Sequence, residues 1–245
     1  MTIGGVQFRI AEVPLVLRSE AEAVSSLVES RELRKVAFLI IATVVGSAVF
    51  GAVVGCWRSP VQAVYTAVKF PMLILLTVVG NAMLNGMLAP LLGVRIGMRD
   101  SFLAVLLSFA IAGIILCGMA PLLGFVIWNV PKRGFELSSV YLAYQFMQLM
   151  IVAMIAFAGI AANVRLLRYL EFRSPSRAAA LRLLFSWLAG NLLLGSQICW
   201  VLRPFIGRPQ DDVIFLMDDP FQGNFFETCW AAGKALVWQT SEAGQ

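Results

Sequence analysis

The stretch FLAVLLSFAIAGIILCGMAPLLGFVIW, residues 102–128, contains no Asp, Glu, Lys or Arg and decides the fold class of this chain. About 20 apolar residues in helical conformation cross the hydrocarbon core of a bilayer, so this stretch predicts a transmembrane helix. Four further charge-free apolar stretches flank it, at Val36–Cys56, Phe70–Leu92, Val140–Val164 and Leu183–Leu202. The sequence therefore predicts an all-α polytopic membrane protein with about five transmembrane helices and amphipathic segments at both ends.

The composition excludes a soluble globular fold. Hydrophobic residues make up 60% of the 245 residues and charged residues only 13%, whereas soluble domains average roughly 45–50% and about 25%. The chain has no histidine, the commonest haem and zinc ligand, and its four cysteines form no CxxC pair. No nucleophile and base pair is apparent, and no basic run carries interleaved aromatic residues. We therefore expect a protein that is not an enzyme, with no catalytic residue, cofactor, metal or nucleic-acid partner.

Three segments are predicted along the chain. Residues 1–35 contain no continuous apolar run, so we expect no cleavable signal peptide, and the first span itself directs insertion. A capping box at Ser19 precedes apolar residues at helical spacing, which predicts an amphipathic helix at the membrane surface. Residues 36–203 form the five-helix transmembrane domain, and residues 204–245 form an extramembrane segment with a short helix. Pro71 is expected to break the second apolar element into a surface helix and a span.

The basic residues predict the orientation in the membrane. Twelve Arg and Lys residues lie before the first span, between the second and third spans, and between the fourth and fifth spans. The opposite side has four in its loops, which are Arg58 and Lys69 in the first loop and Lys132 and Arg133 in the third, and three more in the C-terminal segment, at Arg203, Arg208 and Lys234. Since Arg and Lys concentrate in cytoplasmic loops, we expect a cytoplasmic N-terminus and a C-terminal segment outside, in a bacterial inner membrane.

Uncharged polar residues inside the spans are the candidate functional residues. They are Asn81 and Asn85 in the second span, Gln145 and Gln148 on one face of the fourth, and Asn191 in the fifth. An unsatisfied amide in hydrocarbon is costly, so we expect these side chains to face the bundle interior. They form either interhelical hydrogen bonds, worth about 0.6 to 2 kcal/mol each, or the lining of a path for a neutral solute.

The first span carries small residues at every fourth position, namely Thr43, Ser47, Gly51 and Gly55. Such a stripe lets helices approach closely, so Ser47, Gly51 and Gly55 are predicted to be packing residues. No charged or protonatable side chain is expected at membrane depth, which argues against a proton-coupled carrier. These features favour a non-catalytic subunit or scaffold that lies in the lipid bilayer and assembles with other subunits or with further copies. A passive transporter or channel for a neutral solute is the alternative.

The segment after Leu202 is both acidic and aromatic. Two aspartate pairs, at 211–212 and 218–219, are predicted to form a solvated rim. Asn224 is predicted to be the N-cap of a short helix. Disordered segments are poor in aromatic residues, so we expect an ordered extramembrane cap. The alternative is a helix that lies in the headgroup layer. The residues predicted to dock a partner are Phe221, Phe225, Phe226 and Trp230.

A polar N-terminal segment followed by five closely spaced spans resembles the Yip1 family of small membrane scaffolds and trafficking factors. This resemblance covers roughly residues 36–203 and implies a scaffold role. Separately, Leu202-Arg203-Pro204-Phe205-Ile206-Gly207, with Pro220-Phe221 and Gly223-Asn224-Phe225-Phe226-Glu227, is similar to a signature of uncharacterised bacterial membrane proteins. The long C-terminal segment departs from the short C-terminus of Yip1-type proteins.

Overall fold

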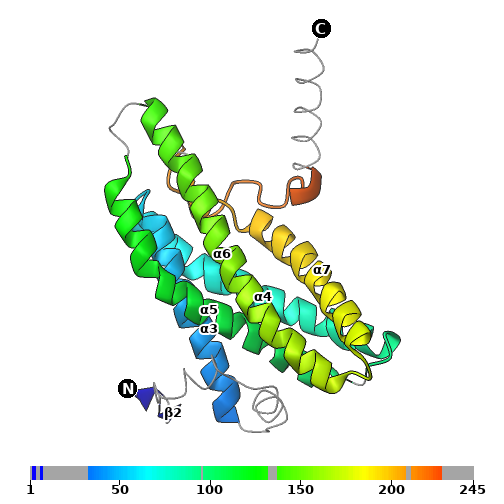
Figure 1. Cartoon of the computed structure of the whole chain (residues 1–245). Coiled ribbons are helices and arrows are strands. Elements are labelled where there is room, and N and C mark those ends of the chain that lie inside the picture. Colours follow the sequence, from blue (N-terminus) through cyan, green and yellow to red (C-terminus); the bar gives the residue numbers. More distant parts are fainter. Residues whose placement is uncertain are drawn as a thin grey trace.

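Five long helices form the body of the computed structural model, which describes residues 2–3, 6–7, 33–94, 96–131, 137–207 and 211–227. The helices are α3 at Leu33–Cys56, α4 at Pro60–Leu91, α5 at Met98–Asn129, α6 at Leu137–Arg173 and α7 at Arg177–Val201 (Figure 1). Two short strands, β1 at Thr2–Ile3 and β2 at Val6–Gln7, form an antiparallel pair.

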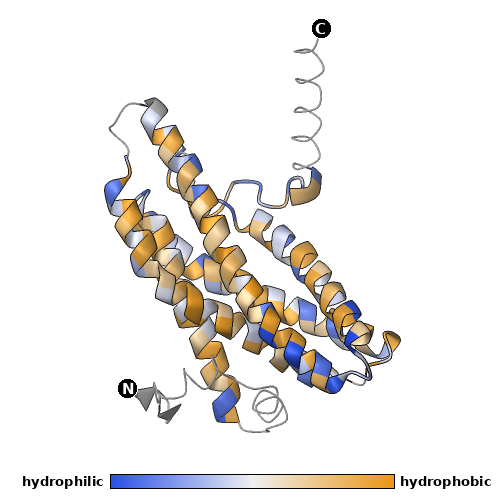
Figure 2. Ribbon diagram, in the orientation of Figure 1, coloured by the Kyte–Doolittle hydropathy of each residue, from blue (hydrophilic) through white to orange (hydrophobic). Residues whose placement is uncertain are grey.

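All five helices are long and apolar enough to cross a membrane. The helices are largely apolar, as Figure 2 shows, and their exposed side chains include Leu142, Leu149 and Leu192. A water-soluble protein would not leave so much apolar surface uncovered. The prediction of an all-α multi-pass membrane protein is confirmed. The predicted amphipathic helix after Ser19 lies outside the described residues.

The helices extend beyond the predicted spans, and two expectations about their ends are wrong. Helix α4 begins at Pro60, after the N-cap Ser59, and continues through Pro71 without the predicted break. A proline removes one backbone donor, and packing against neighbouring helices makes this loss tolerable in a membrane helix. Helix α6 continues to Arg173, so Arg165 lies in a helix and not in the fourth loop. Hydropathy marks only the apolar part of each helix.

Helix α3 packs against both α4 and α5, while α6 covers α5 and α7 covers α4 (Figure 1). Helices α6 and α7 form an antiparallel hairpin, whose second helix is capped by Ser176. The buried apolar residues form two clusters. One contains Leu106, Leu183 and Trp187, and the other contains Phe50 and Met147. The bundle therefore has a core along its whole length.

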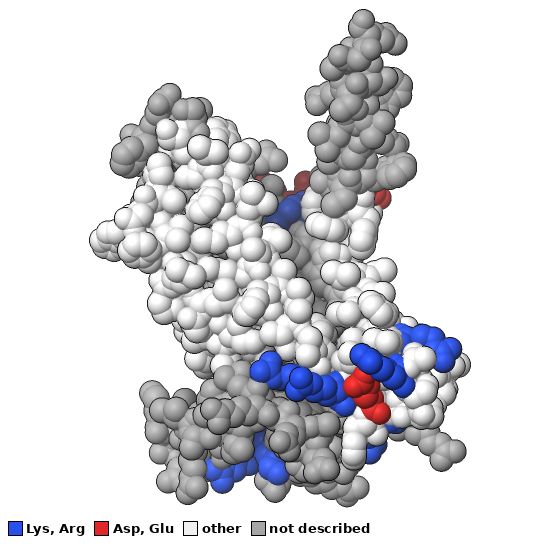
Figure 3. Space-filling model, viewed as in Figure 1, with Lys and Arg blue, Asp and Glu red and all other residues white. Residues whose placement is uncertain are grey.

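The two ends of the bundle differ in charge. At one end, called the basic end below, lie the start of α3, the start of α5, the end of α6 and the start of α7 (Figure 3). At the other, called the tail end, α3 ends, α4 begins and residues 203–207 and 211–227 lie. Among the described residues, the tail end carries the four aspartates at 211–212 and 218–219.

Candidate functional site: two polar clusters on helix α4

The buried face of α4 is polar along most of its length. Because positions three or four apart share one side of a helix, these residues form a row of two runs, at 62–69 and at 77–85, with apolar residues between them. The row is formed by Gln62, Thr66, Lys69, Thr77, Asn81 and Asn85, each at most 4% exposed. Only the last two of these residues were expected to be buried. Two glycines of α7 lie against the row, since a Cβ at Gly190 would come within 2.9 Å of Asn81 Oδ1 and one at Gly195 within 3.8 Å of Thr77.

The first cluster, called the amide cluster below, consists of Asn81, Asn85 and Asn191. The Nδ2 group of Asn81 donates a hydrogen bond to Oδ1 of Asn191 and so joins α4 to α7. Asn85 is fully buried one turn further along α4, yet neither its amide nitrogen nor its amide oxygen has a hydrogen-bond partner among the described residues. The structure thus brings together three of the five amides expected inside the bundle, and among the described residues it leaves both polar atoms of Asn85 and the Oδ1 of Asn81 without a hydrogen-bond partner.

Leucine at the two ends of this cluster is expected to have opposite effects on stability. Asn191→Leu removes the acceptor of the Asn81 amide and should lower the free energy of unfolding by about 1–2 kcal/mol. Asn85→Leu removes a buried amide without a partner and should leave that free energy unchanged or raise it. Unfolding of each variant by SDS titration in mixed micelles measures the difference. A large loss for Asn85→Leu would show that its amide has a bound partner such as water.

The second cluster, called the tail clasp below, lies nearer the start of α4. Three side chains, from Gln62, Thr66 and Lys69, point to the backbone carbonyls of two residues that follow α7. Lys69 Nζ donates to Pro204 O at 2.7 Å, and Thr66 Oγ1 lies 2.9 Å from Phe205 O. Gln62 Nε2 also donates to Phe205 O. Lys69 lies inside α4 and is fully buried, so the structure contradicts the expectation that it lies in a loop.

Aromatic rings surround the tail clasp. The ring of Phe205 packs edge-on against Phe70, with ring centroids 5.3 Å apart. Lys69 Nζ lies 5.0 Å from the ring centroid of Phe215, and that ring contacts Tyr65 edge-on. A cation over an aromatic ring is stabilised by the ring quadrupole, so these rings help to compensate the burial of the ammonium group. The described residues between 203 and 215 are therefore held on α4 by polar and apolar contacts.

The two glutamines of α6 do not face the interior, and the prediction for them is wrong. Gln145 and Gln148 are exposed, because Ala143 and Met147 occupy the buried face of this part of α6. Gln148 Nε2 donates to the hydroxyl of Tyr144 on the same helix, at 3.0 Å. The Tyr144 ring lies 5.9 Å from the ring of Trp57, just beyond the end of α3. Both amides therefore lie toward the tail end, outside the bundle core.

The small residues of α3 lie where the helices approach most closely. A Cβ at Gly51 would come within 2.6 Å of Thr66 O, and one at Gly55 within 2.5 Å of Gln62 O, so both glycines pack on the backbone of α4. Ser47 is buried and its hydroxyl donates to Thr43 O at 2.6 Å. The sequence reasoning missed Gly46. A Cβ at this position would lie only 2.4 Å from the Gly113 carbonyl oxygen on α5.

The aromatic residues predicted to dock a partner remain largely uncovered. Phe221 is 81% exposed, and Phe225 and Phe226 are also exposed. The segment that carries them is ordered locally, because Asn224 Oδ1 accepts from the Glu227 amide as predicted for a cap, and Trp200 Nε1 donates to Gln222 O. Trp230 lies outside the described residues.

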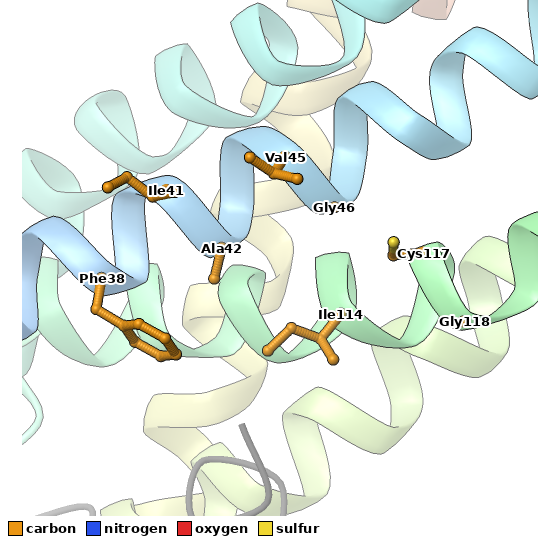
Figure 4. A pocket seen from close by; sticks show the side chains of 8 residues that line it. All are labelled: Phe38, Ile41, Ala42, Val45, Gly46, Ile114, Cys117 and Gly118. Carbon is orange, nitrogen blue, oxygen red and sulfur yellow. The ribbon is translucent and has the colours of Figure 1, made fainter. Parts of the chain in front are cut away.

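An apolar pocket of about 310 Å³ lies between α3 and α5, away from both polar clusters (Figure 4). Its walls include Phe38 and Val45 from α3 and Ile114, Cys117 and Gly118 from α5. Such walls suit a hydrocarbon chain and offer no charge to a polar substrate. Within the described ranges, no group of three or more His, Cys, Asp or Glu side chains is arranged to hold a metal ion.

No family model, characterised protein or solved structure matches this chain.

Proposed function

We propose that this protein is a non-catalytic subunit or scaffold of a larger membrane complex. In this proposal it lies in a bacterial inner membrane with its N-terminus in the cytoplasm and its C-terminal segment outside. The greater number of basic residues at the basic end supports that orientation. The scaffold role is also the one implied by the resemblance to the Yip1 family.

One observation carries the proposal, namely that an anchored segment presents uncovered aromatic rings. The tail clasp holds residues 204–205 on α4, while Phe221, Phe225 and Phe226 beyond it are exposed. Exposed aromatic patches beside polar residues are typical of protein interaction sites. The aspartates at 211–212 and 218–219 lie beside this patch in the sequence and are exposed. The partner that fits has an apolar surface with a basic rim outside the membrane.

Copurification in mild detergent tests this proposal. We expect the full chain to retain a partner in stoichiometric amount, and a Phe221→Ser/Phe225→Ser/Phe226→Ser variant to lose it. The matched control is Leu192→Ala/Leu193→Ala, because these leucines are equally exposed but lie on the apolar face of α7. Light scattering during size exclusion distinguishes a second copy from a different protein. A partner retained by the phenylalanine variant and lost by the leucine variant would move the interface into the membrane.

Cysteine labelling tests the proposed orientation of the chain in the membrane. Single cysteines at Arg34 and Glu227, placed in a chain without its four native cysteines, should react with a membrane-impermeant reagent from opposite sides. Reaction of both cysteines from one side of intact cells would contradict the proposed orientation.

A second candidate, a passive path for a neutral solute, is favoured by one specific feature. Thr77 and Asn81 in the second half of the polar row lie against α7, and the Asn85 amide beside them has no hydrogen-bond partner among the described residues. A neutral solute with donors and acceptors would satisfy such an amide. This function predicts solute flux into liposomes that is lost in Asn85→Leu, whereas the subunit function predicts no flux.

A further inference from the structure

Lys69 is a fully buried cation that forms no ion pair with any Asp or Glu that the structure describes. Its hydrogen bond goes to the neutral carbonyl of Pro204, at 2.7 Å. An ammonium group has three N–H donors, so two of them have no acceptor among the described residues. Lysine is almost never fully buried unless it is paired. The charge and the two remaining donors together fit an anionic ligand.

The ring of Phe215 covers the ammonium group on one side, with its centroid 5.0 Å from Lys69 Nζ. Phe215 belongs to an irregular segment, is partly exposed, and packs edge-on against Tyr65. The ring of Phe205 lies 5.9 Å from Nζ, but it packs against the apolar core of the bundle. Movement of the Phe215 ring alone therefore uncovers Lys69 and leaves its hydrogen bond to Pro204 intact.

Lys69 lies within the apolar length of α4 and not at its end. Nine residues separate it from Pro60 at the start of the helix, which corresponds to about 14 Å along the axis. Beside Lys69 around the helix, the exposed apolar side chains of Val68, Met72 and Leu76 follow one another at four-residue spacing. A hydrocarbon tail can lie on this lipid-facing surface of α4 and needs no cavity.

We propose that Lys69 binds the carboxylate of a long-chain fatty acid, and that the Phe215 ring moves aside when this ligand binds. The carboxylate pairs with the ammonium group, and the hydrocarbon tail lies along Val68, Met72 and Leu76. The exchange is favourable because a hydrogen-bonded ion pair is stronger than the contact of a cation with an aromatic ring.

The surroundings of Lys69 select this ligand class. One buried positive charge is matched by one negative charge, since any further unpaired charge among apolar groups is costly. The space of a single phenyl ring suits a carboxylate, whereas a phosphodiester with its headgroup is larger. The site is separate from the exposed aromatic residues proposed to dock a protein partner.

Titration of the full chain in mild detergent with hexadecanoate, followed by native mass spectrometry, tests the site. We expect one hexadecanoate to bind each chain, and its uncharged methyl ester to bind at least about 10-fold more weakly. Lys69→Met should weaken hexadecanoate binding by a similar factor, whereas Lys69→Arg, which keeps the charge, should weaken it less than about threefold. Equal affinity for the acid and the ester, or an unchanged affinity in Lys69→Met, would overturn the proposal.

The role of Phe215 has a readout that a misfolded variant cannot produce, because the expected effect is a gain. Phe215→Ala should tighten hexadecanoate binding about threefold to tenfold, since the ligand no longer displaces a ring from the cation. The matched control is Leu216→Ala, at the next position of the same segment, where the side chain is 36% exposed, and it should leave the affinity unchanged. The same affinity in Phe215→Ala as in the parent chain would contradict the covering role of this ring.

Two further measurements separate the fatty acid from other causes. Saturating hexadecanoate should raise the rate of chymotrypsin cleavage after Phe215 in the parent chain and should not raise it further in Lys69→Met. An equal increase in both chains would indicate a general detergent effect and would overturn the proposal. Displacement of hexadecanoate by millimolar acetate would also overturn it, since the site would then accept a soluble carboxylate.

Discussion

Replacing Gly46 by alanine is expected to lower the free energy of unfolding by about 3 kcal/mol, at the upper end of the usual cost of overpacking. The added Cβ would lie 2.4 Å from the Gly113 carbonyl oxygen and 2.6 Å from its carbonyl carbon. Both are backbone atoms, which cannot rotate away as the end of a side chain can. Helices α3 and α5 must therefore move apart along their whole contact. SDS titration in mixed micelles, followed by far-ultraviolet circular dichroism, measures the loss.

Gly118→Ala is the matched control for this substitution. Gly46 and Gly118 both line the apolar pocket between α3 and α5 (Figure 4). A Cβ at Gly118 would meet no atom within 4 Å. Alanine is the better helix former by about 1 kcal/mol, so this variant should be as stable as the parent or slightly more stable. Equal losses for the two variants would show that close approach at Gly46 does not hold the two helices together.

Replacing Lys69 by methionine is expected to raise the rate of chymotrypsin cleavage after Phe215 about 10- to 100-fold. Methionine keeps the length of the side chain but leaves the Pro204 carbonyl without its charged donor. An unsatisfied buried carbonyl costs about 1–3 kcal/mol, which favours the detached segment by that amount. Proteolysis follows the population of the open state when opening is fast relative to cleavage. The time course of cleavage of the full chain in mild detergent gives the rate.

Two threonines of α4 provide a matched pair for the same experiment. Thr66 and Thr77 each lie within hydrogen-bond distance of the carbonyl four residues earlier, at 2.8 Å and 2.7 Å, but only Thr66 also reaches Phe205 O. Thr66→Val should therefore raise the cleavage rate severalfold and Thr77→Val should leave it unchanged. If Lys69→Met leaves the rate unchanged as well, the rings of Phe205 and Phe215 hold the segment without the clasp.

The helical fold could be predicted because the apolar stretches are long and free of charge. Residues 102–128 correspond closely to α5, which runs from Met98 to Asn129. Helix ends were harder to predict, since a helix continues outside hydrocarbon until a cap or a loop stops it. Thus α4 extends back to the Ser59 cap, and α6 continues past Arg165. Hydropathy reports the solvent that a residue prefers, whereas helix length depends on backbone hydrogen bonding.

The two polar clusters differed in how visible they were in the sequence. Asn81 is conspicuous because it interrupts an apolar stretch, and its partner Asn191 does the same in α7. The tail clasp was missed because Gln62 and Lys69 precede the apolar stretch and resemble loop residues in solvent. Their acceptors are backbone carbonyls, which every residue has, so no side-chain pattern marks residues 204–205 as the partner. The spacing of Gln62, Thr66 and Lys69 on one helix face was the available signal.

The glutamines of α6 show the limit of the rule that intramembrane amides face inward. That rule assumes that hydrocarbon is the only alternative to the interior. Gln148 donates a hydrogen bond to Tyr144 of its own helix, and the Tyr144 ring lies against Trp57 beyond the end of α3. Near a helix end, an amide reaches headgroups and water, so its exposure costs little.

The contacts of the tail clasp can form only late in the synthesis of the chain. Lys69 is translated 135 residues before Pro204, whose carbonyl it binds. While the ribosome is still making α5, α6 and α7, the polar start of α4 has no acceptor from the rest of the chain and must be hydrated at the translocon or in the headgroup layer. The contacts of the first helices to be made are thus completed by residues that follow the last membrane helix. A chain truncated before residue 204 therefore leaves Lys69 without the backbone acceptor that it has in the finished bundle.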